Sequence, residues 1–216
     1  GHWGDFFEYF KRKFPDSNFE ILEIPGNGTQ YKEITPMSAT ETILKIKNSS
    51  LLLKNSEPVN IFGISLGGML ALKWAEVYPE EVKNLFVVNS SLPQLSKFHQ
   101  RLRPENYSKI ILSLFLNNFL EREKKILEMT SNNPNRLNLF VNKFSEFSEL
   151  HPVAYKNLFR QLLLASNIKI QSPPKARVKI LCSERDRFVD FNCSIKIAEF
   201  LSTTSIVHPT AGHDLP

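Results

Sequence analysis

The sequence contains little cysteine and no long apolar run. Its 216 residues include only two cysteines, Cys182 and Cys193, too few for the disulfide framework of a small secreted domain. We expect both to be reduced thiols, the alternative being a redox pair. A membrane span needs roughly 18 consecutive apolar residues, and the longest apolar stretch, residues 110–120, is interrupted by one serine and two asparagines. A membrane-spanning helix is therefore not expected.

Blocks of like charge are also missing. The chain has 27 Lys and Arg against 22 Asp and Glu, a net charge of +5 that is scattered along the sequence. This pattern favours a solvated, mildly basic surface over nucleic-acid binding. The first residues lack the basic and apolar regions of a signal peptide. We therefore predict a cytoplasmic protein that binds neither nucleic acid nor membrane.

Short apolar segments alternate with amphipathic ones in the first 91 residues and again after residue 172. Such alternation predicts an α/β fold, a mainly parallel sheet with helices on both faces. The predicted strands are residues 19–24, 59–62, 85–88, 178–182 and 205–207, and the predicted helices are residues 6–14, 40–53, 66–78 and 194–201. Between them, residues 92–172 carry only helical patterns. We predict an α/β core formed by 1–91 and 173–216, with a helical cap at 92–172.

The segment Gly63-Ile64-Ser65-Leu66-Gly67 is a G-x-S-x-G motif between a predicted strand and a predicted helix. A tight strand-to-helix turn exposes the serine hydroxyl above the sheet edge, and side chains at the flanking glycines are expected to collide with backbone. Ser65 is therefore the candidate nucleophile. The alternative is a glycine-rich turn around a structural serine.

A nucleophilic serine needs a base, and the base needs a carboxylate. His213 follows the last predicted strand, at the edge that also carries Ser65. His208 lies in or beside that strand, and a structural role is expected for it. Asp186 follows the strand at 178–182, with Glu184 and Asp190 as rival carboxylates. The order Ser65, Asp186, His213 is the one found in α/β hydrolases.

With these residues the chain resembles the α/β-hydrolase superfamily, and within it the small capped carboxylesterases related to the pimeloyl-carrier methyl ester esterase. Three matches are Gly63 to Gly68, Asp186-x-x-Val189 and Gly212-His213, and the Pro25 to Gly28 loop is similar to the Pro-Gly-x-Gly loop of that family. The resemblance covers nearly the whole chain, although the cap matches only in position and helical character.

The resemblance also implies an oxyanion hole. The family carries His-Gly-Trp-Gly where this chain reads Gly1-His2-Trp3-Gly4, so the order of the first pair is inverted. Matching the Trp-Gly pair makes the backbone N–H groups of Trp3 and Leu66 the two donors, with His2 as the alternative to Trp3. In the family a central strand precedes this loop and a helix follows the histidine. We therefore expect the sequence to be part of a longer protein and to fold poorly alone, with buried backbone groups unpaired.

The predicted reaction is hydrolysis of a small-molecule carboxylic ester through an acyl-enzyme, without metal or cofactor, since no His/Cys/Asp cluster has metal-ligand spacing. The same triad also serves thioester hydrolysis, acyl transfer and C–C bond cleavage, and a non-catalytic binding protein is a third alternative. Phe115, Phe119 and Phe144 are expected either to line the acyl pocket or to pack the cap. An acyl carrier protein is a candidate partner for three basic residues of the cap, Arg101, Arg103 and Lys109.

Overall fold

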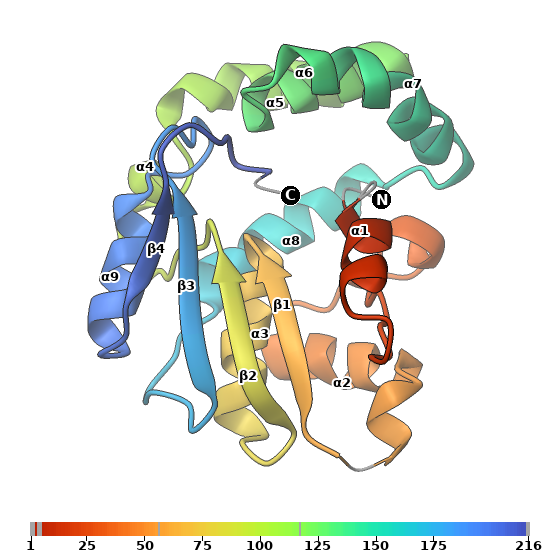
Figure 1. Ribbon diagram of the computed structural model, residues 1–216. Helices are drawn as coiled ribbons and strands as arrows, with labels where there is room; N and C mark the ends of the chain where they lie inside the picture. Colours follow the sequence, from red (N-terminus) through yellow and green to blue (C-terminus); the bar gives the residue numbers. More distant parts are fainter. Residues whose placement is uncertain (1–2, 4–5, 56, 117, 215–216) are drawn as a thin grey trace.

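The computed structural model describes residues 3, 6–55, 57–116 and 118–214 of the chain (Figure 1). In this part, four parallel strands form one sheet in the order β1-β2-β3-β4. The strands are β1 (Val59–Ile64), β2 (Val82–Val88), β3 (Arg177–Ser183) and β4 (Ser205–His208). Each confirms a predicted strand and is one to three residues longer than predicted. Because all four are parallel, their carboxyl ends share one edge of the sheet.

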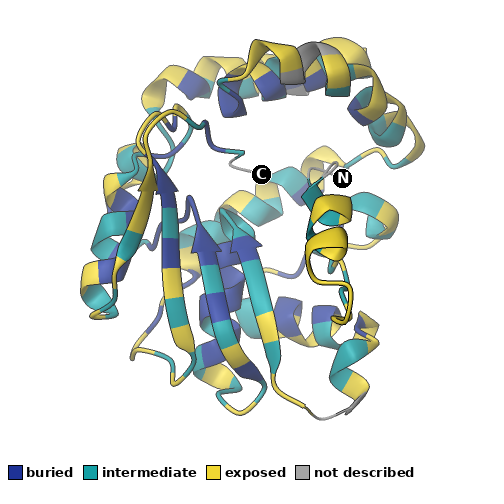
Figure 2. Cartoon of the chain, viewed as in Figure 1, coloured by how far each residue is buried: buried dark blue, intermediate teal, exposed yellow. Residues whose placement is uncertain are grey.

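Helices that precede or connect the strands cover one face of the sheet. Helix α3 (Leu66–Val77) packs on β1 and β2, α9 (Asn192–Phe200) packs on β3 and β4, and α2 (Ala39–Ser49) packs against α3. Apolar side chains of these helices and of the strands form the main hydrophobic core, in which Leu72 and Leu85 are fully buried. Figure 2 shows buried residues concentrated in β2, in the carboxyl end of β3 and in α3 behind them.

The first helix, α1 (Phe6–Lys13), covers the opposite face beside β1. Successive side chains of a strand point to opposite faces. Ile61 packs against the main core, so the adjacent Phe62 points away from it. The rings of Trp3 and Phe6 contact Phe62 at centroid distances of 5.5 and 5.9 Å. Aromatic contacts therefore hold Trp3 and α1 against β1.

The strand predicted at residues 19–24 is wrong. This segment pairs with no strand in the described part of the chain, and a strand requires a neighbour for its ladder of hydrogen bonds. Its apolar residues Leu22 and Ile24 still pack against the core. The Glu20 carboxylate accepts hydrogen bonds from Leu51 N–H at 2.9 Å and from Ser50 Oγ at 2.7 Å. Side-chain bonds and apolar packing thus replace the predicted ladder.

Residues 92–172 contain only helices in their described part. They are α4 (Phe98–Arg101), α5 (Tyr107–Leu114), α6 (Phe119–Thr130), α7 (Pro134–Leu150) and α8 (Tyr155–Asn167), with one 3-10 turn at Pro104–Asn106. In Figure 1, α5, α6 and α7 arch over the carboxyl ends of the strands. Leu164 of α8 and Ile168 after it belong to the main core. Helix α8, which follows α7 in the chain, is therefore packed into the α/β part of the molecule and anchors the cap helices to it.

Both cysteines are free and buried. Burial and the nearby charge of Asp186 raise the pKa of the Cys182 thiol to about 11, and burial raises the pKa of Cys193 as well. The thiolate is the reactive form of cysteine, so neither side chain is activated for redox chemistry. Within the described residues, the helices are all too short or too polar to cross a membrane.

Candidate active site

The turn between β1 and α3 holds Ser65 in a sharp backbone conformation. Ser65 has φ 53° and ψ −119°, in the left-handed half of the map that residues with a side chain rarely enter. Its N–H donates to Val88 O at 2.9 Å, and its carbonyl oxygen accepts from Met69 N–H at 3.2 Å and from Ser90 Oγ at 2.8 Å. Such strain persists where the surroundings fix the backbone from several sides. The Ser65 side chain makes no capping bond to α3.

The two glycines of the motif differ in the space that a side chain would find. A Cβ on Gly63 would lie 2.6 Å from Gly67 O and 2.8 Å from Gly68 N, so any side chain there collides with the first turn of α3. A Cβ on Gly67 would meet nothing within 4 Å. The predicted backbone collision is therefore present at Gly63 and wrong for Gly67, because Gly67 faces open space.

Of the two predicted oxyanion donors, Leu66 lies in the Ser65 turn and Trp3 contacts the strand before it. Leu66 is the first residue of α3, where backbone N–H groups have no acceptor within the helix and the helix dipole is positive. The Trp3 ring packs on Phe62, three residues before Ser65 in β1. This contact tethers Trp3 to the strand that leads into the turn. The alternative donor, His2, lies outside the described residues.

Asp186 and His213 are in direct contact. His213 Nδ1 lies 2.7 Å from Asp186 Oδ2, and the two residues are only 5% and 2% exposed. The other carboxylate oxygen of Asp186 accepts from the N–H groups of Phe188 at 2.7 Å and Val189 at 2.9 Å. The Phe188 ring covers the imidazole at a centroid distance of 5.0 Å. The carboxylate is thus fixed by backbone donors and directed at one ring nitrogen of His213.

The pKa of His213 lies above its ordinary value of 6.5. Burial removes the imidazolium from water and lowers the pKa, but the charge and hydrogen bond of Asp186, together with the charge of Asp214, outweigh it. The pair therefore favours a charged histidine, the form that a base adopts after it accepts a proton.

Neither rival carboxylate contacts His213. Glu184 is exposed, and Asp190 Oδ1 accepts from Asn192 N–H and Nδ2, both at 3.0 Å, at the start of α9. His208 has the structural role expected of it, because its Nδ1 accepts from Ala211 N–H at 3.0 Å.

Two neighbouring residues that the sequence did not single out join the backbones of Ser65 and His213. Asn89 and Ser90 directly follow β2, at the same sheet edge. Asn89 Nδ2 donates to His213 O at 2.6 Å and to Ser183 Oγ at 3.1 Å, while Asn89 Oδ1 accepts from Ser183 N–H at 2.8 Å. Ser90 Oγ donates to Ser65 O. The sequence did contain one indication of this role, because both polar residues directly follow an apolar strand and so lie at the sheet edge that carries Ser65.

Replacement of Asn89 by alanine is expected to destabilise the protein by about 2–4 kcal/mol, because several buried groups lose their partner at once. Asn89 is also in the left-handed region at φ 43°, which alanine adopts less readily than asparagine. Urea unfolding measures the change. The matched control is Asn84→Ala on β2, the strand that precedes Asn89, where an exposed bond to Asn60 is lost and the expected change is below about 0.5 kcal/mol. Equal effects of the two substitutions would contradict the role given to Asn89.

The three phenylalanines expected to line the acyl pocket or to pack the cap have different surroundings. Phe144 is only 5% exposed and stacks on Phe140 at a centroid distance of 5.8 Å. Phe115 is 78% exposed at the end of α5. The guanidinium of Arg122 lies 4.7 Å from the centre of the Phe119 ring. Phe144 is thus occupied in packing within the cap, whereas Phe115 is exposed and Phe119 is half-buried.

The basic residues predicted as a docking surface are not equally available. Arg101 Nη2 donates to Ala165 O at 2.7 Å, and its Nε donates to Ser91 Oγ at 3.3 Å. Burial lowers the pKa of this guanidinium. Arg103 is half-buried and Lys109 is exposed. Arg101 therefore joins the cap to the core, and Lys109 is the exposed cation of the three.

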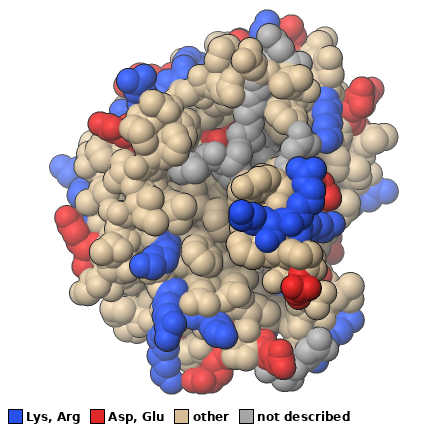
Figure 3. All heavy atoms as spheres, in the orientation of Figure 1, with Lys and Arg blue, Asp and Glu red and all other residues tan. Residues whose placement is uncertain are grey.

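On the face shown in Figure 3, basic side chains gather over α1, whose last turn carries Lys11, Arg12 and Lys13. Positive charge at the carboxyl end of a helix is favoured by the helix dipole. This group therefore has a local electrostatic reason and does not require an anionic partner.

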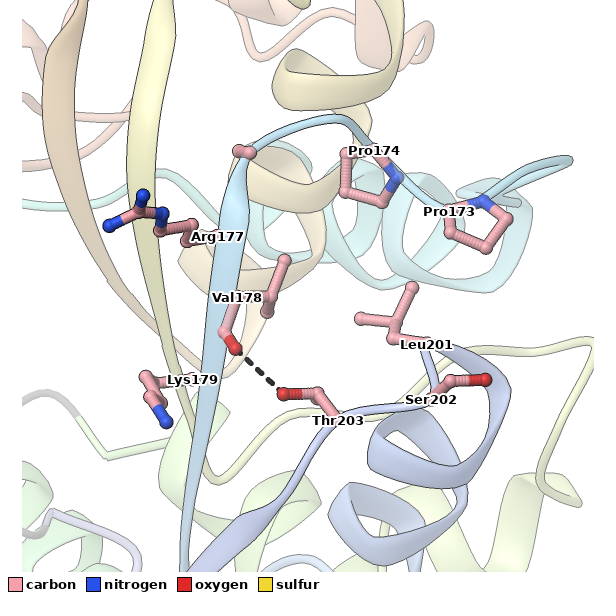
Figure 4. A pocket seen from close by; sticks show the side chains of 9 residues that line it. Pro173, Pro174, Arg177, Val178, Lys179, Leu201, Ser202 and Thr203 are labelled. Carbon is pink, nitrogen blue, oxygen red and sulfur yellow. Dashed lines mark hydrogen bonds between the residues drawn. The ribbon is translucent and has the colours of Figure 1, made fainter.

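In the described part of the chain, two cavities are lined by neither Ser65 nor His213. One, of about 340 Å³, opens where β3 begins, between Pro173, Pro174 and Thr203 (Figure 4). It is at the opposite end of the strand from Asp186. The other is a groove of about 1190 Å³ behind the Asp186–His213 pair, between the cap and the loops after β3 and β4. Its walls include Arg103, Lys109, Glu184 and Asp214, so charges of both signs face it.

A parallel sheet with a strained serine turn after one strand and a buried Asp–His pair after two others defines an α/β hydrolase. The chain belongs to this family: the model of the alpha/beta hydrolase fold matches residues 21–215. The predicted fold class and family resemblance are thereby confirmed.

Two known proteins show how far the similarity extends. The chain is 31% identical over 163 residues to a pimeloyl-[acyl-carrier protein] methyl ester esterase of Wigglesworthia glossinidia brevipalpis, a match covering 70% of this chain and 57% of that protein. The chain thus spans little more than half the length of this relative. An esterase from Exiguobacterium antarcticum has a TM-score of 0.70 at 18% identity, covering 97% of this chain and 80% of that one.

An α/β hydrolase from a deep-sea metagenome of the Medee basin has a TM-score of 0.66 at 22% identity, and the match covers 97% of this chain and 78% of that one. At such identities, the two solved structures establish the fold and nothing beyond it.

Proposed function

We propose that this protein hydrolyses a carboxylic ester through an acyl-enzyme formed on Ser65. The observation that carries the proposal is the buried contact between Asp186 Oδ2 and His213 Nδ1 at 2.7 Å. The backbone of His213 is held by Asn89, and that of Ser65 by the adjacent Ser90. The family and its esterase relative support the same reaction class.

In the proposed reaction His213 accepts the Ser65 proton through Nε2 while the serine oxygen attacks the ester carbonyl. Asp186 holds the imidazole with its proton on Nδ1 and stabilises the imidazolium. The backbone N–H groups of Leu66 and Trp3 donate to the oxyanion. His213 then returns the proton to the leaving alcohol and activates a water molecule, which releases the acid.

For the substrate we infer an ester whose acyl group enters beneath the cap helices, with Phe115 and Phe119 as the aromatic contacts. The curated relative is named for an acyl-carrier-protein ester, and this supports an acyl carrier as one form of the substrate. Among Arg101, Arg103 and Lys109, the exposed cation is Lys109, and we propose it as a contact for an acidic carrier.

The test is labelling with a fluorophosphonate, which phosphonylates activated serines. We expect the wild-type protein to gain one phosphonyl group, the probe less HF, on the peptide that contains Ser65, and Ser65→Ala to gain none. Ser166→Ala is the matched control, because Ser166 is a serine of α8 whose hydroxyl donates to Leu162 O. This control is expected to label like the wild type.

A panel of ester, thioester and amide substrates then identifies the bond that is cleaved. Faster turnover of the thioester than of the matched ester would redirect the proposal to the thioester reaction. A folded wild-type protein that neither labels nor turns over any member of the panel would overturn the proposal in favour of a binding protein.

A further inference from the structure

The residues at the end of α6 and just after it contact both loops that carry the Asp–His pair. Asn132 Nδ2 donates to Arg185 O at 2.9 Å, to Thr210 O at 3.2 Å and to Ala211 O at 3.0 Å. Arg185 precedes Asp186, and Ala211 lies two residues before His213. One amide group of the cap thus bridges the loop after β3 and the loop after β4.

Thr130 holds the residue that follows His213. Its carbonyl oxygen accepts from Asp214 N–H at 3.1 Å, and its Oγ1 lies 2.8 Å from Asp214 Oδ2 and 3.1 Å from Ile126 O. A bond to a charged carboxylate is the stronger of the two, so the hydroxyl hydrogen is directed mainly to Asp214. The position of the Asp214 charge beside His213 is therefore set by a cap residue.

The same short segment lies against the backbone of the His213 loop. A Cβ on Gly212 would collide with Thr130 O and would lie 2.9 Å from Asn132 N. From the other loop, Arg187 Nη2 donates to Ser131 O at 2.7 Å and to Glu128 O at 2.8 Å. Backbone contact and hydrogen bonds thus connect each loop to the end of α6.

We propose that residues 130–132, the α6 latch, position the His213 loop against the Asp186 loop, so that the placement of the cap sets the geometry of the Asp–His pair. The inference rests on the proposed function and extends it, because it makes Thr130 and Asn132 positioning residues. A substrate that displaces α6 would, through these contacts, also displace His213 relative to Asp186.

Several titratable groups surround the pair. Asp186 and Asp214 both raise the pKa of His213. Glu184, Arg185 and Arg187 after β3, and His208 at the end of β4, line the groove behind the pair. The start of the cap adds Arg103, Glu105 and Lys109 to that groove. All of these groups remain in the variants proposed below, so a changed titration of His213 reports a changed geometry.

The test compares Asn132→Ala and Thr130→Val with two matched controls. Asn167→Ala removes an amide bond to Leu163 O, and Thr203→Val removes a hydroxyl bond to Val178 O at the far end of β3 (Figure 4). The readouts are kcat and KM for a small ester, the pH profile of kcat/KM, and the pKa of His213 followed by NMR of labelled histidine.

For both latch variants we expect kcat to fall roughly tenfold, the scale of a modest misplacement of catalytic groups, with a smaller change in KM. The NMR-measured pKa of His213 and the acid limb of the profile should both move to lower pH, because Asp186 and Asp214 lie less closely against the imidazole. The controls should match the wild type in every readout.

A latch variant that loses stability but keeps the kcat and the His213 pKa of the controls would overturn the proposal. Should Asn132→Ala not fold, Asn132→Ser and Thr130→Val decide the question by the same criteria. The NMR titration needs no turnover. A wild type without activity therefore rejects the proposed function, while the difference in His213 pKa between variants still decides the latch.

Discussion

Replacing Asp186 with asparagine is expected to lower kcat/KM for ester hydrolysis by about 10⁴-fold, the scale for losing the carboxylate of a serine triad. In the wild type, Asp186 Oδ2 accepts from His213 Nδ1, which leaves Nε2 free to take the serine proton. An asparagine at this position donates an N–H to Nδ1 and favours the tautomer whose Nε2 carries hydrogen. That tautomer cannot act as a base.

The pH dependence provides a second signature of the same substitution. Only neutral His213 is a base, and its pKa is raised, so kcat/KM of the wild type should rise with pH through a midpoint above 6.5. In Asp186→Asn the largest raising cause is removed while burial, which lowers the pKa, remains. The midpoint should therefore move to lower pH as the plateau falls. Rates between pH 5 and 9 provide the measurement.

The control for Asp186→Asn is Asp190→Asn, in the same loop. Asp190 Oδ1 binds Asn192 and does not contact His213. We expect its kcat/KM to stay within about threefold of the wild type, as for a residue outside the reacting groups. A loss as severe as that of Asp186→Asn, or a midpoint of Asp186→Asn that moves upward, would count against Asp186 as the partner of His213. Thermal unfolding checks that both variants are folded.

The features of this site that the sequence predicted are those encoded by short segments. The strained turn follows from Gly63 and Ser65 between an apolar strand and an amphipathic helix. The positions of Asp186 and His213 follow from the rule that parallel strands end at one edge. Each inference needs only a strand, its end and the next few residues, which is the range over which sequence patterns are informative.

The features that sequence reasoning missed depend on distant segments. Asn89 and Asn132 matter because their amides reach carbonyl groups more than 50 residues away, and neither residue has a local motif. The segment 19–24 has a strand-like pattern, but a strand forms only beside a partner, which the pattern does not contain. The space beside Gly67 is likewise a property of the assembled fold, whereas the collision at Gly63 involves residues only four and five positions away.

The difference between the two glycines leads to the second large prediction. Gly63→Ala is expected to destabilise the protein by about 3 kcal/mol, the upper range for overpacking, because the new methyl would overlap backbone atoms of Gly67 and Gly68. Backbone atoms in the first turn of α3 cannot rotate away from the new methyl as a side chain can. The overlap is removed only if α3 moves away from β1, and this movement also displaces Ser65. The folded fraction should therefore lose roughly 100-fold in kcat/KM.

Gly67→Ala is the matched control, with the same substitution four residues away in the same motif. Its methyl would meet no atom within 4 Å, and alanine is favoured over glycine in a helix by up to about 1 kcal/mol. Urea unfolding should therefore show Gly67→Ala at least as stable as the wild type and Gly63→Ala far less stable. Equal tolerance of both substitutions would mean that β1 and α3 are not packed as described.

The same variant also tests where the substrate lies. Because Gly67 faces open space beside Ser65, a change of KM in a fully stable Gly67→Ala would place bound substrate against this glycine.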